Sequence, residues 1–207
     1  IRAARSSLVG SEMCIRDREG LREPLETGSI AIARAGQHAE FPARFQLIAA
    51  MNPCPCGYLG DSQSDCRCSG DRVTTYRNKV SGPLLDRIDL HVEVLRPPTD
   101  VLRESNDGAE NSAIVARRVA TAWQVQMKRS GTANSRLDGE QLESACVLDD
   151  DCWALLETAA ERFNLSARAH QRILRVSRTI ADLARAKKIA PPHVAEALSL
   201  RCLDRRA

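Results

Sequence analysis

The sequence has few aromatic residues, no long apolar run and no phosphate-binding loop motif. Aromatic residues make up only 3% of its 207 residues, so an array of stacking side chains for single-stranded nucleic acid is not evident. No apolar run approaches the roughly 20 residues needed to cross a bilayer, and the N-terminus lacks the apolar core of a secretory signal. We therefore expect a cytoplasmic protein without a membrane anchor. The pattern G-x-x-x-x-G-K-S/T is also absent, which excludes a P-loop within this sequence.

The composition that remains is that of a folded globular protein. Charged residues make up 28% and hydrophobic residues 43% of the chain, as is usual for soluble domains. The formal net charge of +3 is too small to indicate a nucleic-acid partner by itself. A chain of this length forms one or two compact units.

Eight cysteines are more than usual, and half of them are clustered. The sequences C-P-C-G and C-R-C place four thiols close together, at Cys54, Cys56, Cys66 and Cys68. In a cytosolic protein, clustered pairs favour a metal site over disulfides, and Zn²⁺ prefers a tetrahedron of sulfur ligands. Because the C-x-C spacing is tighter than the usual C-x₂-C, free thiols or disulfides are the alternative. A zinc ion held by all four thiolates would be structural, since no position is left open for a substrate.

An apolar run at residues 45–51 ends abruptly at Asn52 and Pro53. Seven residues without a charge, followed by a proline, predict a strand buried on both faces; a buried helix segment is the alternative. Ligands of open α/β sheets bind beyond the carboxyl ends of strands, and Asn52 occupies that position. Its amide could orient a water molecule or contact a phosphate; the alternative is an ordinary turn residue.

The stretch at residues 88–94 alternates apolar and polar residues, which predicts a second strand. Arg87 stands immediately before it. Spacing alone predicts a local ion pair between Arg87 and Asp86 or Asp89, worth about 0–1 kcal/mol at a surface. An arginine at the edge of a subunit can instead reach a neighbour's ATP and stabilise charge on the transferred phosphoryl group.

Helices are predicted along much of the remaining sequence. After a polar stretch that follows Pro97, helices are the only regular secondary structure that the sequence predicts. Helical spacing covers residues 18–26 (interrupted at Pro24), 71–80, 112–128, 152–163, 167–187 and 191–200. Ser112 and Ser166 are predicted N-caps of two later helices, and the acidic run Asp149-Asp150-Asp151 is predicted to cap the helix at 152–163 by complementing its macrodipole. On the helix at 167–187, Arg172, Arg175 and Arg178 either lie on a solvated face or follow DNA phosphates.

Three stretches, LIAAMNPCPCGYLGD, CRC and SGPLLDRIDLHVEV, occur in the order found in magnesium-chelatase-like AAA+ ATPases of the ComM/YifB family. The sequence resembles this family from about Arg18 to about Asp204. The resemblance implies an α/β fold: a partial AAA+ (P-loop NTPase) core that lacks its Walker A/B half, followed by an all-α helical lid. It also implies that Asn52 is the sensor-1 residue, Arg87 the arginine finger and Arg168 the sensor-2 residue.

The resemblance also implies a division of the chain. Residues 18–98 would form the C-terminal half of the AAA+ core with a β-hairpin and the four-cysteine insertion, residues 99–110 a linker, and residues 111–204 the lid. No apolar strand ending in Asp-Glu precedes Arg18, so Walker B is missing together with Walker A; in the family both lie upstream. Residues 1–17 lack the family likeness, and we interpret them as foreign sequence or a poorly ordered native terminus.

The function implied by the resemblance is that of a ring-forming motor, hexameric by family analogy, that uses ATP and Mg²⁺ on branched or single-stranded DNA. The expected role is branch migration during natural transformation. Asn52 would orient the attacking water, Arg87 would act across the subunit interface, and Arg168 would couple lid movement to the nucleotide state. A β-hairpin predicted at residues 29–41, which faces the pore in the family, would place His38 near DNA or in solvent.

Two other functions fit the same motifs. One is a magnesium-chelatase-type motor subunit that acts on a metal-inserting partner. The other is a non-enzymatic, zinc-stabilised helical interaction module. In every case a chain without Walker residues should not hydrolyse ATP alone, and half of a parallel sheet predicts poor solubility in isolation.

Overall fold

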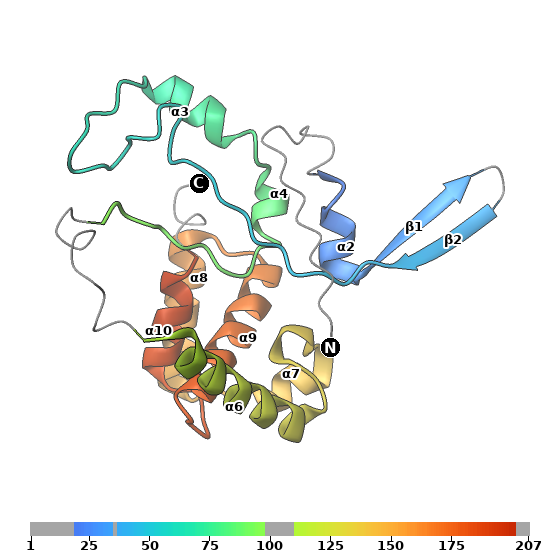
Figure 1. The fold of residues 1–207 in the computed structure, drawn as a ribbon. Coiled ribbons are helices and arrows are strands. Elements are labelled where there is room, and N and C mark those ends of the chain that lie inside the picture. Colours follow the sequence, from blue (N-terminus) through green and yellow to red (C-terminus); the bar gives the residue numbers. More distant parts are fainter. Residues whose placement is uncertain (1–18, 35–36, 98–109, 202–207) are drawn as a thin grey trace. The chain divides into compact units, whose positions relative to one another are not determined.

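The structure, a computed structural model, describes residues 19–34, 37–97 and 110–201 (Figure 1). The chain divides into two compact units, Ile1–Arg87 and Ile88–Ala207, and each is described by itself. The expectations for residues 1–17, for nearly all of the linker at 99–110 and for residues beyond 201 lie outside the described residues. No helix in the described ranges is long and apolar enough to cross a membrane.

The described residues of the first unit form a β-hairpin, as predicted, and three short helices. Its elements are α2 (Arg22–Thr27), β1 (Ser29–Arg34), β2 (Gln37–Pro42), α3 (Gly70–Arg77) and α4 (Gly82–Leu85). Helix α2 ends at Gly28, whose φ of 72° suits a residue without a Cβ atom. The helical piece predicted at residues 18–26 is interrupted, but at Gly20 and Leu21 rather than at Pro24. Pro24 lies in the first turn of α2, where a missing N–H costs no intrahelical hydrogen bond.

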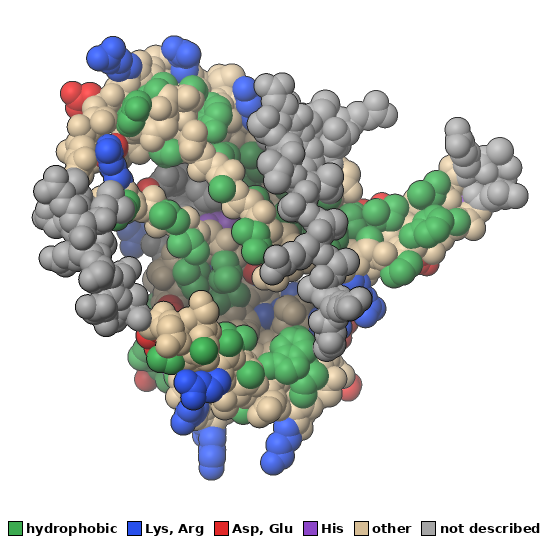
Figure 2. All heavy atoms as spheres, viewed as in Figure 1, with side chains coloured by type: hydrophobic (Ala, Val, Ile, Leu, Met, Phe, Trp, Pro, Cys, Tyr) green, Lys and Arg blue, Asp and Glu red, His purple; other side chains and the backbone are tan. Residues whose placement is uncertain are grey.

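The hairpin pairs its strands in an antiparallel register that gathers apolar side chains on one face. Ile30 pairs with Phe41, and Ile32 pairs with Ala39; residues that are paired directly share a face of the ribbon. His38 pairs with Ala33 and therefore lies on the opposite face, within β2 rather than at the tip. The apolar face is exposed, and Figure 2 shows apolar side chains along the surface of this arm.

The buried strand predicted at residues 45–51 is not formed. The segment runs without regular secondary structure, and its side chains are largely exposed, with Ile48 at 85%. A strand buried on both faces needs hydrogen-bonded neighbours, because its own backbone groups cannot pair with one another. In the described part of the chain the only sheet is the β1–β2 hairpin, so the predicted parallel α/β sheet is absent there and the run has no partner.

The second predicted strand, at residues 88–94, is wrong for the same reason, and its faces are reversed. The segment forms a single parallel bridge, between His91 and Arg201. His91 is only 5% exposed, whereas Leu90, Val92 and Val94 are exposed, Val94 at 88%. The polar residue is buried because the His91 N–H donates to the carbonyl of Leu200 over 2.6 Å. Pairing with the chain's C-terminal segment, and not apolar alternation, decides which face turns inward.

From residue 111 to residue 200 the regular secondary structure of the second unit is helical, as predicted. It consists of α6 (Ser112–Ser130), the 3₁₀ turn η1 (Asn134–Arg136), α7 (Gly139–Ala145), α8 (Asp150–Phe163), α9 (Ala167–Leu183) and α10 (Pro191–Ser199). Asp149 caps α8 and Ser166 caps α9 through their side-chain oxygens, which confirms both predicted caps. The cap of α6 is Asn111 instead of Ser112. A single apolar core, in which Leu156, Ile173 and Val194 are fully buried, joins α7 to α10.

Helix α6 contributes little of its apolar side to that core. Ala122 and Gln126 are buried, but Ile114, Val119 and Trp123 of the predicted apolar stripe are exposed. The Gln126 side chain accepts a hydrogen bond from the backbone N–H of Asn134 over 3.0 Å. The helix is therefore attached to the unit near its C-terminal end.

A buried ion cluster on α9 fixes the attachment of α6. The Asp182 carboxylate, 3% exposed, accepts hydrogen bonds from Arg129 at 2.7 Å, Asn134 at 2.8 Å and Arg178 at 3.1 Å. Burial alone would raise the pKa of Asp182, but the hydrogen bonds from Arg129 and Asn134 and the two arginine charges outweigh it and lower that pKa. Arg178 also donates to the carbonyl of Ala186 over 2.7 Å.

The arginines of α9 correct two further expectations. Arg178 is buried, and Arg175 donates through Nε to the carbonyl of Leu137 over 2.7 Å. Their guanidinium groups hold helices together, so they neither form a solvated face nor offer a track for phosphates. The helix also ends earlier than predicted, at Leu183, because Arg185 takes a left-handed φ of 58°.

The substitution Asp182→Asn should lower the free energy of unfolding of the helical unit, because two arginine charges would lose the carboxylate that they share. Breaking such a buried pair costs about 3–5 kcal/mol. Asp151→Asn, an exposed change in the first turn of α8, is the matched control and should cost less than about 1 kcal/mol. Urea unfolding followed by tryptophan emission measures this unit alone, since both tryptophans, Trp123 and Trp153, lie in it. Equal midpoints for the two variants would contradict the assignment.

His170 should make the stability of the helical unit depend on pH. Its ring stacks on Trp153 with centroids 5.7 Å apart, and burial lowers the pKa of His170. The unfolded chain, with a histidine pKa of about 6.5, then binds more protons than the folded chain, so stability present above that pH is lost as the pH falls through and below it. In His170→Phe, which keeps a ring, the midpoint of urea unfolding should change less between pH 7 and pH 5. Identical pH profiles would rule the histidine out.

Candidate functional site

Four cysteine sulfurs converge in the first unit. The Sγ atom of Cys54 lies 3.3 Å from that of Cys56 and 3.6 Å from that of Cys66, and the Cys56 and Cys66 sulfurs are 3.6 Å apart. All four sulfurs, that of Cys68 included, lie within 4.8 Å of one another. A disulfide requires about 2.05 Å, so none is present among them. Four thiolates at about 2.3 Å from one ion would be about 3.8 Å apart, which is close to the observed spacing.

Local turns produce this convergence. The N–H of Gly57 donates to the carbonyl of Cys54 over 3.0 Å, and the N–H of Asp61 donates to that of Tyr58 over 3.1 Å. Gly57 and Gly60 have φ angles of 85° and 86°, which residues with a Cβ atom rarely adopt. The loop therefore reverses twice between the first cysteine pair and the second.

The protonation of the thiols indicates that the cluster suits a cation. A hydrogen bond from the backbone of Tyr58, followed by one from the Cys54 side chain, lowers the pKa of Cys56 to about 6. At Cys66 a hydrogen bond from the backbone of Cys68 acts in the lowering direction, but burial and the sulfurs of Cys56 and Cys54 outweigh it and raise the pKa to about 12. One thiolate thus opposes the ionisation of its neighbours. A divalent cation bound among them removes that opposition, because it favours all four thiolates.

Asn52, the first predicted nucleotide-sensing residue, lies two residues before the cysteine cluster and is exposed. Its neighbour Pro53 accepts a hydrogen bond from Nε of Arg77, on α3, over 3.2 Å. Helix α3 begins directly after Cys68, with the Ser69 side chain accepting from the N–H of Arg72. No pattern in the sequence predicts the Arg77 contact.

Arg87 is paired within its own unit. Its guanidinium donates to the carboxylate of Glu26 and, over 2.7 Å, to the carbonyl of Pro83, and its side chain is 10% exposed. The local ion pair predicted with Asp86 or Asp89 is replaced by one with a residue 61 positions away. The salt bridge links α2 to the turn after α4.

Arg168, the third predicted residue, is exposed in the first turn of α9. One turn further along that helix, Arg172 forms an ion pair with Asp89. Arg201 donates to the carbonyl of Ile88 over 3.0 Å. Arg172 therefore anchors the segment at residues 88–91 within the second unit, which periodicity could not predict. Asn52 and Arg87 belong to the first unit and Arg168 to the second.

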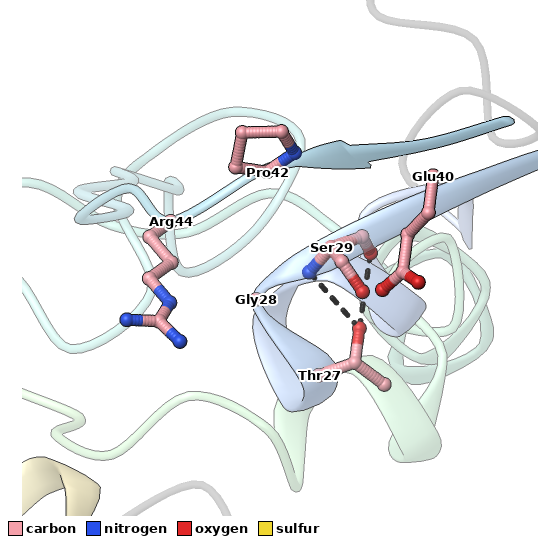
Figure 3. A pocket seen from close by; sticks show the side chains of 6 residues that line it. All are labelled: Thr27, Gly28, Ser29, Glu40, Pro42 and Arg44. Carbon is pink, nitrogen blue, oxygen red and sulfur yellow. Dashed lines mark hydrogen bonds between the residues drawn. The ribbon is translucent and has the colours of Figure 1, made fainter.

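A shallow depression lies at the base of the hairpin (Figure 3). Thr27 donates through Oγ1 to the carbonyl of Ser29 over 3.0 Å, and the Arg44 and Glu40 side chains stand on either side. A Cβ atom on Gly28 would lie 3.0 Å from Cγ of Arg44, so this glycine leaves room for the Arg44 side chain. Contacts among the lining residues of the depression hold the base of the hairpin together, and the six lining residues include no cysteine or histidine.

Comparison with known proteins identifies the family. Residues 11–102 match the family model described as "Magnesium chelatase, subunit ChlI", and residues 109–201 match the model of that subunit's C-terminal region. The first match thus includes residues 11–17, where the sequence had shown no likeness.

Full-length relatives agree with this result. The chain is 44% identical to the competence protein ComM of Haemophilus influenzae over 90% of its length, and 42% and 40% identical to the YifB proteins of Salmonella typhimurium and Escherichia coli over 92% of its length. It spans only 36–37% of the length of these relatives. The resemblance read from the three motif stretches is thereby confirmed: the chain belongs to the magnesium-chelatase-like AAA+ family that includes ComM and YifB.

Proposed function

We propose that this chain is the C-terminal part of a ring-forming AAA+ motor that uses ATP and Mg²⁺. One observation carries the proposal. Two extended apolar segments, at residues 45–51 and 88–95, expose side chains such as Ile48 and Val94. In the described residues the first has no strand partner, and the second has only the single bridge between His91 and Arg201. Exposed apolar strands of this kind need a sheet to complete them. The remaining two thirds of a ComM-like protein would supply that sheet, together with the Walker A and Walker B residues.

Completion of the sheet would bring the candidate residues to nucleotide. Asn52 follows the first extended segment, where an amide can orient the water that attacks the γ-phosphate. Arg87 precedes the second segment and would act on the neighbouring subunit's ATP. Its salt bridge with Glu26, whose side chain is 35% exposed, would have to open for that action. Arg168 would report the nucleotide state to the lid.

DNA is the proposed substrate, with branch migration during natural transformation as the role. The relative named for competence supports a function in DNA uptake. The β1–β2 hairpin is the proposed contact with branched or single-stranded DNA. Its His38 face is the polar one, whereas the face of Ile30 and Phe41 is apolar and suits protein better than phosphate.

Two alternative functions keep specific support. The description of the matching family favours a chelatase-type motor subunit acting on a metal-inserting partner. The four-cysteine cluster, together with a helical unit that has its own core, favours a zinc-stabilised interaction module without turnover.

The cysteine cluster, in this proposal, holds a structural Zn²⁺ ion. Four thiolates satisfy zinc's preferred tetrahedron and leave no position for a substrate. A structural zinc site contributes about 10–16 kcal/mol of apparent binding energy. That energy would fold a loop in which Cys54 is the one apolar residue, among the described residues 52–68, that is fully buried.

The motor can be tested by substitutions in the full-length protein. Asn52→Ala and Arg87→Ala should each lower kcat for ATP, the latter by about 10³–10⁵-fold if it acts as a finger. Arg87→Ala subunits should also depress the turnover of wild-type subunits when the two are mixed in one ring. Arg117→Ala, an exposed change on α6, is the control. The isolated chain should show no turnover.

The same assay separates the three functions. Stimulation by branched DNA supports the DNA motor, stimulation by a chelatase partner supports the second function, and absence of turnover in the full-length protein supports the third.

The zinc site can be tested on the chain itself by metal analysis. Purified protein should contain one zinc ion per chain, and Cys66→Ser should lose it and become sensitive to proteolysis within residues 52–68. Cys146→Ser, a buried cysteine of the helical unit, should keep its zinc. Purification of the wild-type chain under reducing conditions without any bound metal would refute the site.

A further inference from the structure

We propose that the cysteine centre is a positioning device for Asn52, and that Arg77 transmits its effect. The centre would hold in place the segment at residues 52–57, here called the tip, which carries the Asn52 amide. Metal occupancy would then determine how precisely that amide is oriented. This inference rests on the proposed function for the role of Asn52, but its structural part can be tested separately.

Few rotatable bonds separate the amide from the centre. Only Pro53 stands between Asn52 and Cys54. The ring of Pro53 fixes its φ near −65°, and the Cys54 side chain is 0% exposed. A metal ion bound to Cys54 would therefore restrict the backbone that carries Asn52 almost directly.

Pro53 has a second connection to the cysteine cluster, through helix α3. The cluster ends at Cys68, and α3 starts immediately afterwards at Gly70, capped by Ser69. From the last turn of this helix, Arg77 returns to donate a hydrogen bond to the carbonyl of Pro53 over 3.2 Å. Pro53 is thus held on one side through Cys54 and on the other through the helix that Cys68 anchors. A metal site that served only to stabilise the loop would not require the hydrogen bond from Arg77 to Pro53.

Little else holds the tip. The segment before it, at residues 45–51, has no strand partner in the described part of the chain. On the other side, Gly57 lies beside the Asn52 side chain, since a Cβ atom on Gly57 would be in ordinary van der Waals contact with Nδ2 of Asn52, at 3.9 Å. Position of the amide therefore depends on the cysteine loop and on Arg77. Groups that orient a reacting water tolerate little displacement, since a shift of about 1 Å can cost about 100-fold in rate.

Arg77→Gln in the full-length protein tests the inference, because it leaves all four cysteines in place. Zinc content and KM for ATP should be unchanged, while kcat should fall roughly 10- to 100-fold. Amide hydrogen exchange should become faster at residues 52–57, and removal of zinc from the wild-type protein should produce the same increase. Arg77→Lys, which restores a donor, should recover part of both effects. Arg72→Gln, on the exposed side of the same helix, should behave as wild type.

Each contrary result has a distinct meaning. The inference is overturned if Arg77→Gln keeps the wild-type kcat and the wild-type exchange at residues 52–57, or if it loses zinc, since Arg77 would then serve folding. If Asn52→Ala itself turns over ATP normally, the proposed role of Asn52 fails. The exchange experiment would still decide whether zinc and Arg77 hold the tip.

Discussion

Hydrogen bonding of the backbone decides which parts of this chain are organised. A helix pairs its backbone groups internally, whereas a strand depends on a neighbour. The second unit is built from helices and forms a core around Leu156, Ile173 and Val194. In the first unit the hairpin alone pairs its strands, and residues 45–51 stay extended and exposed among the described residues. The contrast between the two units follows from this difference and not from hydrophobicity, since both contain strongly apolar segments.

The same constraint explains which sequence predictions are confirmed. Caps such as Asp149 and Ser166 depend on residues three positions apart, and the hairpin depends on a short connection, so local sequence suffices for them. The strands at 45–51 and 88–94 depend on partners that no local pattern reveals. His91 shows the consequence: alternation assigns it to the outer face, but its bridge with Arg201 buries it.

In the candidate site, too, local features could be predicted from the sequence and long-range contacts could not. Spacing alone indicated four cysteines, and their sulfurs do converge, because thiols with so few residues between them need only turns to meet. The contacts that give the site its surroundings were not predictable. Arg77 reaches Pro53 across 24 positions and Arg87 reaches Glu26 across 61. Arginine side chains are long and their partners are common, so a sequence contains many equally plausible pairs.

The scarcity of a core in the first unit gives the thiol chemistry its importance. Among the described residues of that unit, the buried apolar side chains are Pro24, Cys54 and Leu84, far fewer than a domain normally needs to hold a loop in place. Packing therefore contributes little to the order around Asn52, and a metal ion held by the four thiolates, as proposed, would be its strongest source. Under this proposal, oxidation or chelation that removes the metal from the thiolates would also disturb the conformation at Asn52. Metal binding at Cys54 and orientation of the Asn52 amide would then depend on the same local conformational equilibrium.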